Sequence, residues 1–436
     1  MPFTTFLDSA ARLFSSSFAD REAVKRYQSR RLRRLVRYAG EHVPYYRRRF
    51  EQVGLDLERF RGLEDLAALP ISSKDDLFDC RPEDLISRKV AADRLYARTT
   101  SGSTGRPFTV RCSWWEERFL SALRMQAYWR MGIGPRDKTA QIRFRGRAAG
   151  IERGLSFLRR LGLFRTVLLD SSLDPRDIAR RLEPLRPDVI RGYANLTSLV
   201  ADAVLAQDLI VRPRLITVGG DILTAGMRRR ISEAFRAPVR ETYGSHEFNL
   251  LAWECPDSGV LHVCEEGIVL EVVNDGHPVA VGERGEVVAT ALHSFAQPFI
   301  RFRLGDLVTR GAESCRCGLP YSTIRSIEGR IYDRIILPDG RAASPGDVLT
   351  HLERNFDWLQ QYQLVQVSQA LVVLRLVPKS EPPPADLRAV HRLMNEFLGP
   401  GVEHRVDLLT AIPLAPGEKY RASMSRVFSN YDDSTQ

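Results

Sequence analysis

The sequence is poor in lysine and has no long apolar run. Of its 64 basic residues six are lysine, and the arginines that supply most of the net charge of +10 are scattered along the chain. Scattered arginines argue against a nucleic-acid partner, whereas an excess of positive charge suits small anionic substrates. No stretch approaches the ~20 apolar residues that cross a bilayer, and the N-terminus lacks the basic region of a signal peptide. We therefore expect a cytoplasmic protein with no nucleic acid and no membrane span.

Cysteine is also scarce, with six residues in the chain. Without a secretion signal we expect no disulfides, and clustered cysteines then indicate a metal. A Cys-x6-His … Cys-x-Cys pattern is formed by Cys255, His262, Cys315 and Cys317. Three thiolates and an imidazole predict a closed tetrahedral Zn²⁺ site with a structural role. Cys264 is the alternative ligand, and the alternative interpretation is free, half-buried cysteines beside a surface histidine.

The chain's 436 residues suit two or three domains. Helices and loops are expected over the first ~90 residues. Short apolar segments then alternate with amphipathic helical ones, which predicts an α/β fold with a largely parallel sheet. The expected strands are 138–144, 164–170, 187–193, 214–221 and 238–244.

From about residue 260 close-spaced strands predict a β-rich segment, and a break follows near Gly329. The last ~100 residues alternate again and are long enough for a small α+β domain. The predicted fold is therefore α/β, with a large N-terminal domain over 1–329 that contains mixed sheets and helices. A small C-terminal domain would cover 330–436.

A hydroxyl-rich stretch, "TTSGSTGRPFTV", runs from Thr99 to Val110. Its glycines and proline exclude a packed helix or a central strand. A loop with small hydroxyls and open backbone N–H groups suits phosphate oxygens. It is not a Walker loop, because no Gly-Lys-Ser/Thr follows. The alternative is an ordinary Ser/Gly linker.

Four later motifs complete a pattern: "YGSHEF" with Glu247, "FRLGDL" with Asp306, "EGRIYDRI" with Arg330 and "PGEKY" with Lys419. In this order and spacing, together with the hydroxyl loop, they resemble the adenylate-forming superfamily of acyl-CoA synthetases and nonribosomal adenylation domains. The segments "RRLVRYAGEHVPYYRRRF", "PDVIRGYANLTSLVA" and "RSIEGRIYDRI" look like the phenylacetate–CoA ligase branch. "YGSHEFNLLAWEC…GVLHV" looks most like the subgroup connected with capsular polysaccharide biosynthesis.

The resemblance implies a role for each motif. Glu247 would hold Mg²⁺, Asp306 would bind the ribose hydroxyls with help from Arg330, and Lys419 would stabilise the transition state at the α-phosphate. The hydroxyl loop would hold the β- and γ-phosphates through Thr100, Ser101, Gly102, Ser103, Thr104 and Gly105. Adenine would be framed by Gly219, Gly220, Asp221 and Tyr243, and the acid pocket would be lined near Tyr193, Gly219, Gly244 and Ser245. His246 stands where relatives usually have Ser or Thr.

The resemblance also implies the reaction. A carboxylic acid and ATP would give an acyl-adenylate and pyrophosphate. The mobile C-terminal domain would then rotate about a hinge near Arg330–Asp333, and a thiol would displace AMP. Coenzyme A is the simplest acceptor; a carrier-protein thiol or an amine is the alternative. A nucleotide binder without catalysis is a further class, and a homodimer is compatible with the sequence.

Overall fold

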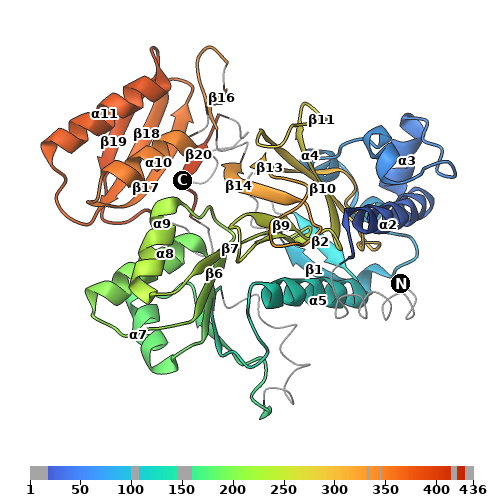
Figure 1. Ribbon diagram of the computed structural model, residues 1–436. Coiled ribbons are helices and arrows are strands. Elements are labelled where there is room, and N and C mark those ends of the chain that lie inside the picture. The colour runs from blue at the N-terminus through green and yellow to red at the C-terminus, as the bar shows by residue number, and fades with distance from the viewer. Residues whose placement is uncertain are drawn as a thin grey trace. The chain divides into compact units, whose positions relative to one another are not determined.

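The computed structural model describes residues 18–99, 108–144, 160–330, 334–340, 342–343, 345–413 and 420–427. The chain divides into two compact units, each made of two separate segments. Unit 1 comprises 1–134 and 240–327, and unit 2 comprises 135–239 and 328–436. Figure 1 labels their elements. The predicted division into 1–329 and 330–436 remains a prediction.

Helices begin unit 1, as the sequence predicts. The longest, α2 (Arg21–His42), starts at Asp20, whose side chain accepts a hydrogen bond from the Ala23 backbone N–H. It ends before Pro44, which opens α3 (Pro44–Gln52). The other described helices of this unit are η1 (Leu63–Ala68), α4 (Lys74–Phe78), η2 (Pro82–Leu85), η3 (Ala92–Arg94) and α5 (Trp114–Arg130).

The strands of unit 1 form a two-stranded sheet and part of a large one. The small sheet pairs β1 (Tyr96–Thr99) with β2 (Thr109–Cys112). In the large sheet the order is β11-β10-β12-β13-β14-β9-β8-β7, and the pairs β10–β12, β12–β13, β7–β8 and β8–β9 are antiparallel. Their bounds are β7 (Val239–Ser245), β8 (Asn249–Glu254), β9 (Leu261–Val263), β10 (Ile268–Asn274), β11 (His277–Pro278), β12 (Arg284–Ala291), β13 (Phe302–Arg310) and β14 (Thr323–Arg330).

Unit 2 begins with a parallel sheet in the order β6-β5-β3-β4. The strands are β3 (Thr139–Arg143), β4 (Thr166–Asp170), β5 (Val189–Gly192) and β6 (Leu215–Gly219). The helices are α7 (Pro175–Leu185), α8 (Ala194–Ala206) and α9 (Ala225–Phe235). Alternating strands and helices with parallel pairing confirm the predicted α/β architecture.

The C-terminal part of unit 2 is the predicted α+β element. Its four-stranded sheet has the order β19-β18-β17-β20, with α10 (Gly346–Asn355) and α11 (Pro384–Leu398) beside it (Figure 1). The strands of the four-stranded sheet are β17 (Leu359–Ser368), β18 (Leu371–Pro378), β19 (Glu403–Leu408) and β20 (Ser423–Ser425). A separate two-stranded sheet pairs β15 (Ile335–Ile336) with β16 (Ala342–Ala343).

A half-buried carboxylate joins the two segments of unit 2. Glu353 of α10 accepts hydrogen bonds from the Thr224 hydroxyl and, at 3.1 Å, from the Gly226 N–H at the start of α9. The Tyr362 hydroxyl donates to the same carboxylate at 2.8 Å. A side chain at Gly226 would place its Cβ 2.9 Å from Glu353 Oε2, so glycine permits this approach.

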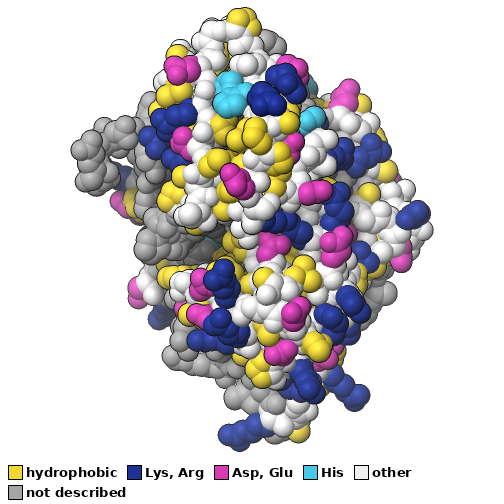
Figure 2. All heavy atoms as spheres, turned by 90° about the vertical axis from the view of Figure 1, so that its left-hand side faces the viewer, with side chains coloured by type: hydrophobic (Ala, Val, Ile, Leu, Met, Phe, Trp, Pro, Cys, Tyr) yellow, Lys and Arg dark blue, Asp and Glu magenta, His cyan; other side chains and the backbone are white. Residues whose placement is uncertain are grey.

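The surface carries intermixed charges. On the face shown in Figure 2, basic and acidic side chains alternate with apolar ones and form no single block. None of the helices that the structure describes is both long enough and apolar enough to cross a membrane.

Candidate functional site

The turn that carries Glu247 joins β7 and β8, which form an antiparallel hairpin with an irregular register at Gly244. A Cβ at Gly244 would lie 2.2 Å from the carbonyl oxygen of Asn249, so this close approach requires glycine. The Phe248 N–H donates to the Ser245 hydroxyl at 3.3 Å. The Phe248 ring packs against Phe299 with centroids 5.9 Å apart. The turn is therefore anchored, and Glu247 is 4% exposed.

Lys74 supplies the positive charge beside Glu247. Its Nζ atom lies 3.1 Å from Glu247 Oε1, and the Glu247 side chain is 3% exposed. Burial alone would raise the pKa of Glu247, but Lys74 together with hydrogen bonds from the backbone and the Ser245 hydroxyl outweighs it, and the pKa lies below the ordinary value. The carboxylate is therefore ionised at neutral pH. Oε1 lies within ion-pair distance of Lys74 and has no hydrogen bond to any described residue.

The donor set at Glu247 suits Mg²⁺. A buried, ionised carboxylate oxygen that keeps its lone pairs is the hard ligand that this ion prefers. Mg²⁺ usually takes one or two carboxylates and completes its shell with water and substrate phosphates. One carboxylate is therefore sufficient for a nucleotide-bridging ion.

Tyr243 and Asp306 meet in the interior of unit 1. The Tyr243 hydroxyl donates to Asp306 Oδ2 at 2.7 Å, and both residues are buried. They come from β7 and β13, separated by 63 positions in the sequence. The structure thus brings together two residues that the resemblance assigns to adenine and ribose.

Further residues that the resemblance assigns to the nucleotide or to the acid pocket lie in unit 2. Gly219 ends β6, and Gly220 follows with φ of 84°, a conformation that favours glycine. Tyr193 follows β5, the parallel neighbour of β6. Ligands of α/β proteins bind at the carboxyl ends of such strands. Asp221 lies near Tyr420: burial raises the pKa of this tyrosine, and the carboxylates of Glu353 and Asp221 raise it further.

Of the remaining predicted residues, two belong to the part of the chain that the structure describes. His246 is half-buried, and Arg330 is exposed at the end of β14. Outside the described residues lie the hinge positions Tyr332 and Asp333, Lys419, and the loop residues Thr100, Ser101, Gly102, Ser103, Thr104 and Gly105. Their roles remain predictions from the resemblance.

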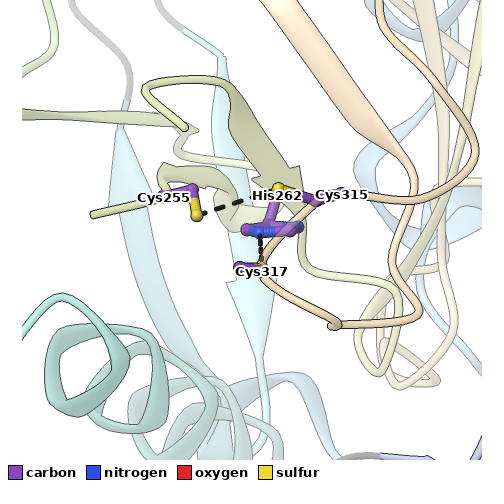
Figure 3. Close-up of side chains that lie close together, drawn as sticks. All are labelled: Cys255, His262, Cys315 and Cys317. Atoms are coloured by element: carbon purple, nitrogen blue, oxygen red, sulfur yellow. Dashed lines mark hydrogen bonds between the residues drawn. The ribbon is translucent and has the colours of Figure 1, made fainter. Parts of the chain in front are cut away.

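The predicted zinc ligands converge in unit 1 (Figure 3). The ligand atoms of Cys255, His262, Cys315 and Cys317 all lie within 4.8 Å of one another. Cys315 Sγ is 3.9 Å from Cys255 Sγ, and Cys317 Sγ is 3.3 Å from His262 Nε2. Ligands of a tetrahedral zinc ion lie roughly 3.4–3.8 Å apart. The four side chains therefore fit a zinc ion.

The protonation of this cluster also suits a cation. Burial, with a contribution from Arg130, lowers the pKa of His262 to about 4, so the imidazole is neutral at pH 7. Burial and the adjacent thiols raise the pKa of Cys317, because neighbouring thiolates repel one another. His262 is fully buried, so the surface-histidine alternative is wrong. Cys264 lies outside the group and packs against Trp253 and Met131.

Sequence reasoning missed Lys74. Its available signal was local: Ser73 and Asp76 form a capping box that fixes Lys74 as the first residue of α4. Its contact with Glu247 spans two distant parts of the sequence, and no spacing rule predicts it.

No protein-family model matches the chain. Curated proteins with similar sequences were found, however. Over 332 residues the chain is 28% identical to the phenylacetate–coenzyme A ligase of Thermus thermophilus, with 73% of this chain and 72% of the relative covered. The phenylacetate–coenzyme A ligase of Escherichia coli is 30% identical over 295 residues, with 64% of this chain and 65% of that enzyme covered.

Solved structures share the fold. A 2-hydroxyisobutyryl-CoA ligase in the postadenylation state superposes with a TM-score of 0.76 at 22% identity, over 93% of this chain and 89% of that one. An anthranilate–CoA ligase with bound anthranoyl-AMP gives 0.58 at 16% identity, over 78% and 68% of the two chains. The predicted fold class is thus confirmed, and so is the resemblance as far as its branch: the chain is a homologue of the phenylacetate–CoA ligases, in the adenylate-forming superfamily. The subgroup connected with capsular polysaccharide biosynthesis remains a prediction.

Proposed function

We propose that the protein activates a carboxylic acid with ATP and transfers the acyl group to coenzyme A. The observation that carries the proposal is the relationship to phenylacetate–CoA ligases over about three quarters of the chain. The buried, ionised Glu247 and the Tyr243–Asp306 pair add support, because they are residues that the resemblance assigns to Mg²⁺ and to the nucleoside.

In the first step a carboxylate oxygen attacks the α-phosphorus of ATP. The bond from that phosphorus to the bridging oxygen breaks, and pyrophosphate leaves. The protein aligns two anions and offsets their charge. Glu247 would hold Mg²⁺, which supplies charge neutralisation at the phosphates. Asp306 would accept hydrogen bonds from the ribose, and Lys419 would meet the developing charge at the α-phosphate.

In the second step the coenzyme A sulfur, after losing its proton, attacks the acyl carbon. The bond to the AMP oxygen breaks, giving a thioester and AMP. Coenzyme A is favoured over a carrier protein or an amine because the curated relatives are named coenzyme A ligases. An aryl or acyl acid is the proposed substrate class. A cytoplasmic location, a homodimer and a biosynthetic role remain predictions from the sequence.

The proposal is tested by ATP–pyrophosphate exchange with a panel of carboxylic acids, followed by thioester formation with coenzyme A. Exchange should require both the acid and Mg²⁺. Replacing Lys419 with Ala should slow exchange roughly a hundredfold or more, as loss of a main electrostatic stabiliser does. Lys379, an exposed lysine of the same unit, gives the matched control Lys379→Ala, which should exchange at the wild-type rate. ATP binding without exchange for any acid would instead identify a nucleotide binder.

We also propose that Cys255, His262, Cys315 and Cys317 hold a structural Zn²⁺. The support is the fit of four ligand atoms within 4.8 Å and a neutral imidazole. A closed set of four protein ligands leaves no position for a substrate, so the ion would stabilise the loop before β14.

Elemental analysis of the purified protein tests this assignment and should find about one zinc per chain. Cys315→Ser should lose the metal and lower the midpoint of thermal unfolding. Cys80→Ser is the control, since Cys80 lies outside the cluster. A wild-type protein that contains no zinc after purification from zinc-supplemented medium would contradict the assignment.

A further inference from the structure

Lys74 has no role among the motifs, although it is the cation at the carboxylate proposed for Mg²⁺. The chain has six lysines, and this one places its ammonium 3.1 Å from Glu247 Oε1. A carboxylate that is 3% exposed has lost nearly all contact with water, and a charge in that position needs compensation. In the described part of the structure Lys74 provides the positive charge, and the Ser245 hydroxyl and the backbone add hydrogen bonds.

The backbone around Lys74 is held firmly. The Ser72 N–H donates to the carbonyl of Arg301 at 3.0 Å, and the Arg303 N–H donates back to Ser72 at 2.8 Å. Residue 72 is thus bridged to β13 beside Phe302. Two residues later the Ser73–Asp76 capping box starts α4. These bonds fix the Cα of Lys74 relative to the turn that carries Glu247.

The side chain of Lys74, in contrast, is not closed in. It is 27% exposed, and it ends in a compact charge on a four-carbon stem with several rotatable bonds. Its contact to Glu247 is an ion pair that leaves Oε1 without a hydrogen bond from any described residue. The ammonium can therefore leave the carboxylate by rotation about its own bonds, with no backbone movement.

We propose that Lys74 is the resident counter-ion of Glu247 in the metal-free protein and that it exchanges with Mg²⁺ at this carboxylate. This inference rests on the proposed assignment of Glu247 to Mg²⁺. In the empty site the ammonium balances the buried charge. When the dication takes Oε1, repulsion at about 4 Å is several kcal/mol at an effective dielectric constant of 20. The ammonium then turns toward its exposed side.

The exchange has a measurable consequence, because a metal that must displace a lysine binds more weakly than one that meets an unpaired carboxylate. Lys74→Met removes the charge and keeps the length of the side chain. Lys89→Met is the matched control, because Lys89 is an exposed lysine in the same unit. Mn²⁺ binding is measured by electron paramagnetic resonance with ATP present, and thermal unfolding is followed in EDTA and in excess MgCl2.

Lys74→Met should reach half-saturation with Mn²⁺ at roughly tenfold lower concentration than the wild type. Its unfolding midpoint should be lower in EDTA, and MgCl2 should raise it by more than in the wild type. Lys89→Met should match the wild type in both measurements. Lys74→Gln keeps a hydrogen-bond donor but no charge, and its Mn²⁺ half-saturation and unfolding midpoint should shift in the same directions. It replaces Lys74→Met in the test if the Met variant does not fold.

Two outcomes are decisive against the idea and can be told apart with Glu247→Gln. If that variant loses Mn²⁺ binding while Lys74→Met and Lys74→Gln bind Mn²⁺ as the wild type does, or more weakly, the exchange is overturned and the metal assignment stands. If Glu247→Gln binds Mn²⁺ as the wild type does, the metal assignment itself is wrong, and the exchange falls with it.

Discussion

Two of the ion pairs that the structure describes in unit 1, Arg301–Glu271 and Lys74–Glu247, differ in how completely they are closed. Glu271 of β10 receives two hydrogen bonds from the guanidinium of Arg301, at 2.9 and 3.1 Å. The same guanidinium donates to the carbonyls of Ala67 and Leu69. Glu247 lies beside the ammonium of Lys74 and has hydrogen bonds with the Ser245 hydroxyl and the backbone, but its Oε1 has no hydrogen bond to any described residue.

The two pairs also differ in protonation. Burial raises the pKa of Glu271 in spite of Arg301, whereas at Glu247 the combined effect of Lys74, the backbone and the Ser245 hydroxyl overcomes burial and brings the pKa below its ordinary value. In the closed pair, the Arg301 guanidinium donates hydrogen bonds to the Glu271 carboxylate and to the carbonyls of Ala67 and Leu69. The open pair keeps a buried carboxylate ionised, with one oxygen that makes no hydrogen bond to any described residue. The two pairs therefore differ in the number of hydrogen bonds across the ion pair, and not in burial alone.

Breaking the closed pair should have the largest effect on stability. Arg301→Met leaves Glu271 buried without its partner and two carbonyls without a donor. We expect a loss of about 3–5 kcal/mol in the free energy of unfolding at pH 7, measured by urea denaturation. A loss below about 1 kcal/mol would show that the Arg301–Glu271 pair does not stabilise the fold as proposed.

Breaking the open pair should affect activity more than stability. Glu247→Gln removes the charge and keeps the shape of the side chain. We expect pyrophosphate exchange to fall roughly 10²–10³-fold, because the proposed metal ligand is lost. The partly exposed Lys74 can turn toward water, so the free energy of unfolding should change by about 1 kcal/mol. Full exchange activity in this variant would contradict the proposed role of Glu247.

His293 extends the comparison to a buried base. Its ring contacts the Tyr27 hydroxyl at 3.0 Å and the Glu266 carbonyl at 2.9 Å. Burial, and then Arg31, lower its pKa well below the ordinary value. The unfolded chain therefore takes up a proton near pH 6.5 that the folded protein refuses, and stability falls as pH drops below 6.5.

The slope should be about 1.4 kcal/mol per pH unit below pH 6.5 from this one group. It is measured from urea denaturation between pH 7 and 5, and the difference between the wild type and His293→Gln isolates it. Equal slopes in the two proteins would show that His293 is protonated in the fold.

The smallest effect is expected at an exposed pair, which sharpens the comparison from the other side. Arg37 pairs with Glu58 on the surface, where the two side chains are 49% and 77% exposed. Arg37→Met should change the free energy of unfolding by about 0–1 kcal/mol. A change as large as that of Arg301→Met would remove the distinction between closed buried pairs and surface ones.

Much of the fold could be predicted because its signals are local. The periodicity of "PRDIARRLEPL" and "AGMRRRISEAF" gives α7 and α9, and the apolar runs between them give β5 and β6. Helix caps, prolines and short apolar runs act within a few residues, so one sequence contains them in full.

Contacts between distant segments were less accessible. The Cys-x-Cys pattern of Cys315 and Cys317 is visible in the sequence, but its approach to His262 depends on the pairing of β9 with β14. The Lys74–Glu247 contact depends on docking of residue 72 along β13. Neither alignment leaves a periodic signal, so the first was found through ligand chemistry and the second was not found.

The division of each unit between two chain segments has a consequence for synthesis. Residues 18–134 are synthesised before the rest of unit 1, which begins at residue 240, and the intervening stretch belongs to the other unit. That other unit in turn needs residues beyond 328. Two incomplete cores therefore exist at the same time while the nascent chain elongates, and contacts between them would lead to misfolding. A translational pause once residue 327 has emerged would favour correct folding, because the core of unit 1 could form before that of unit 2 is completed.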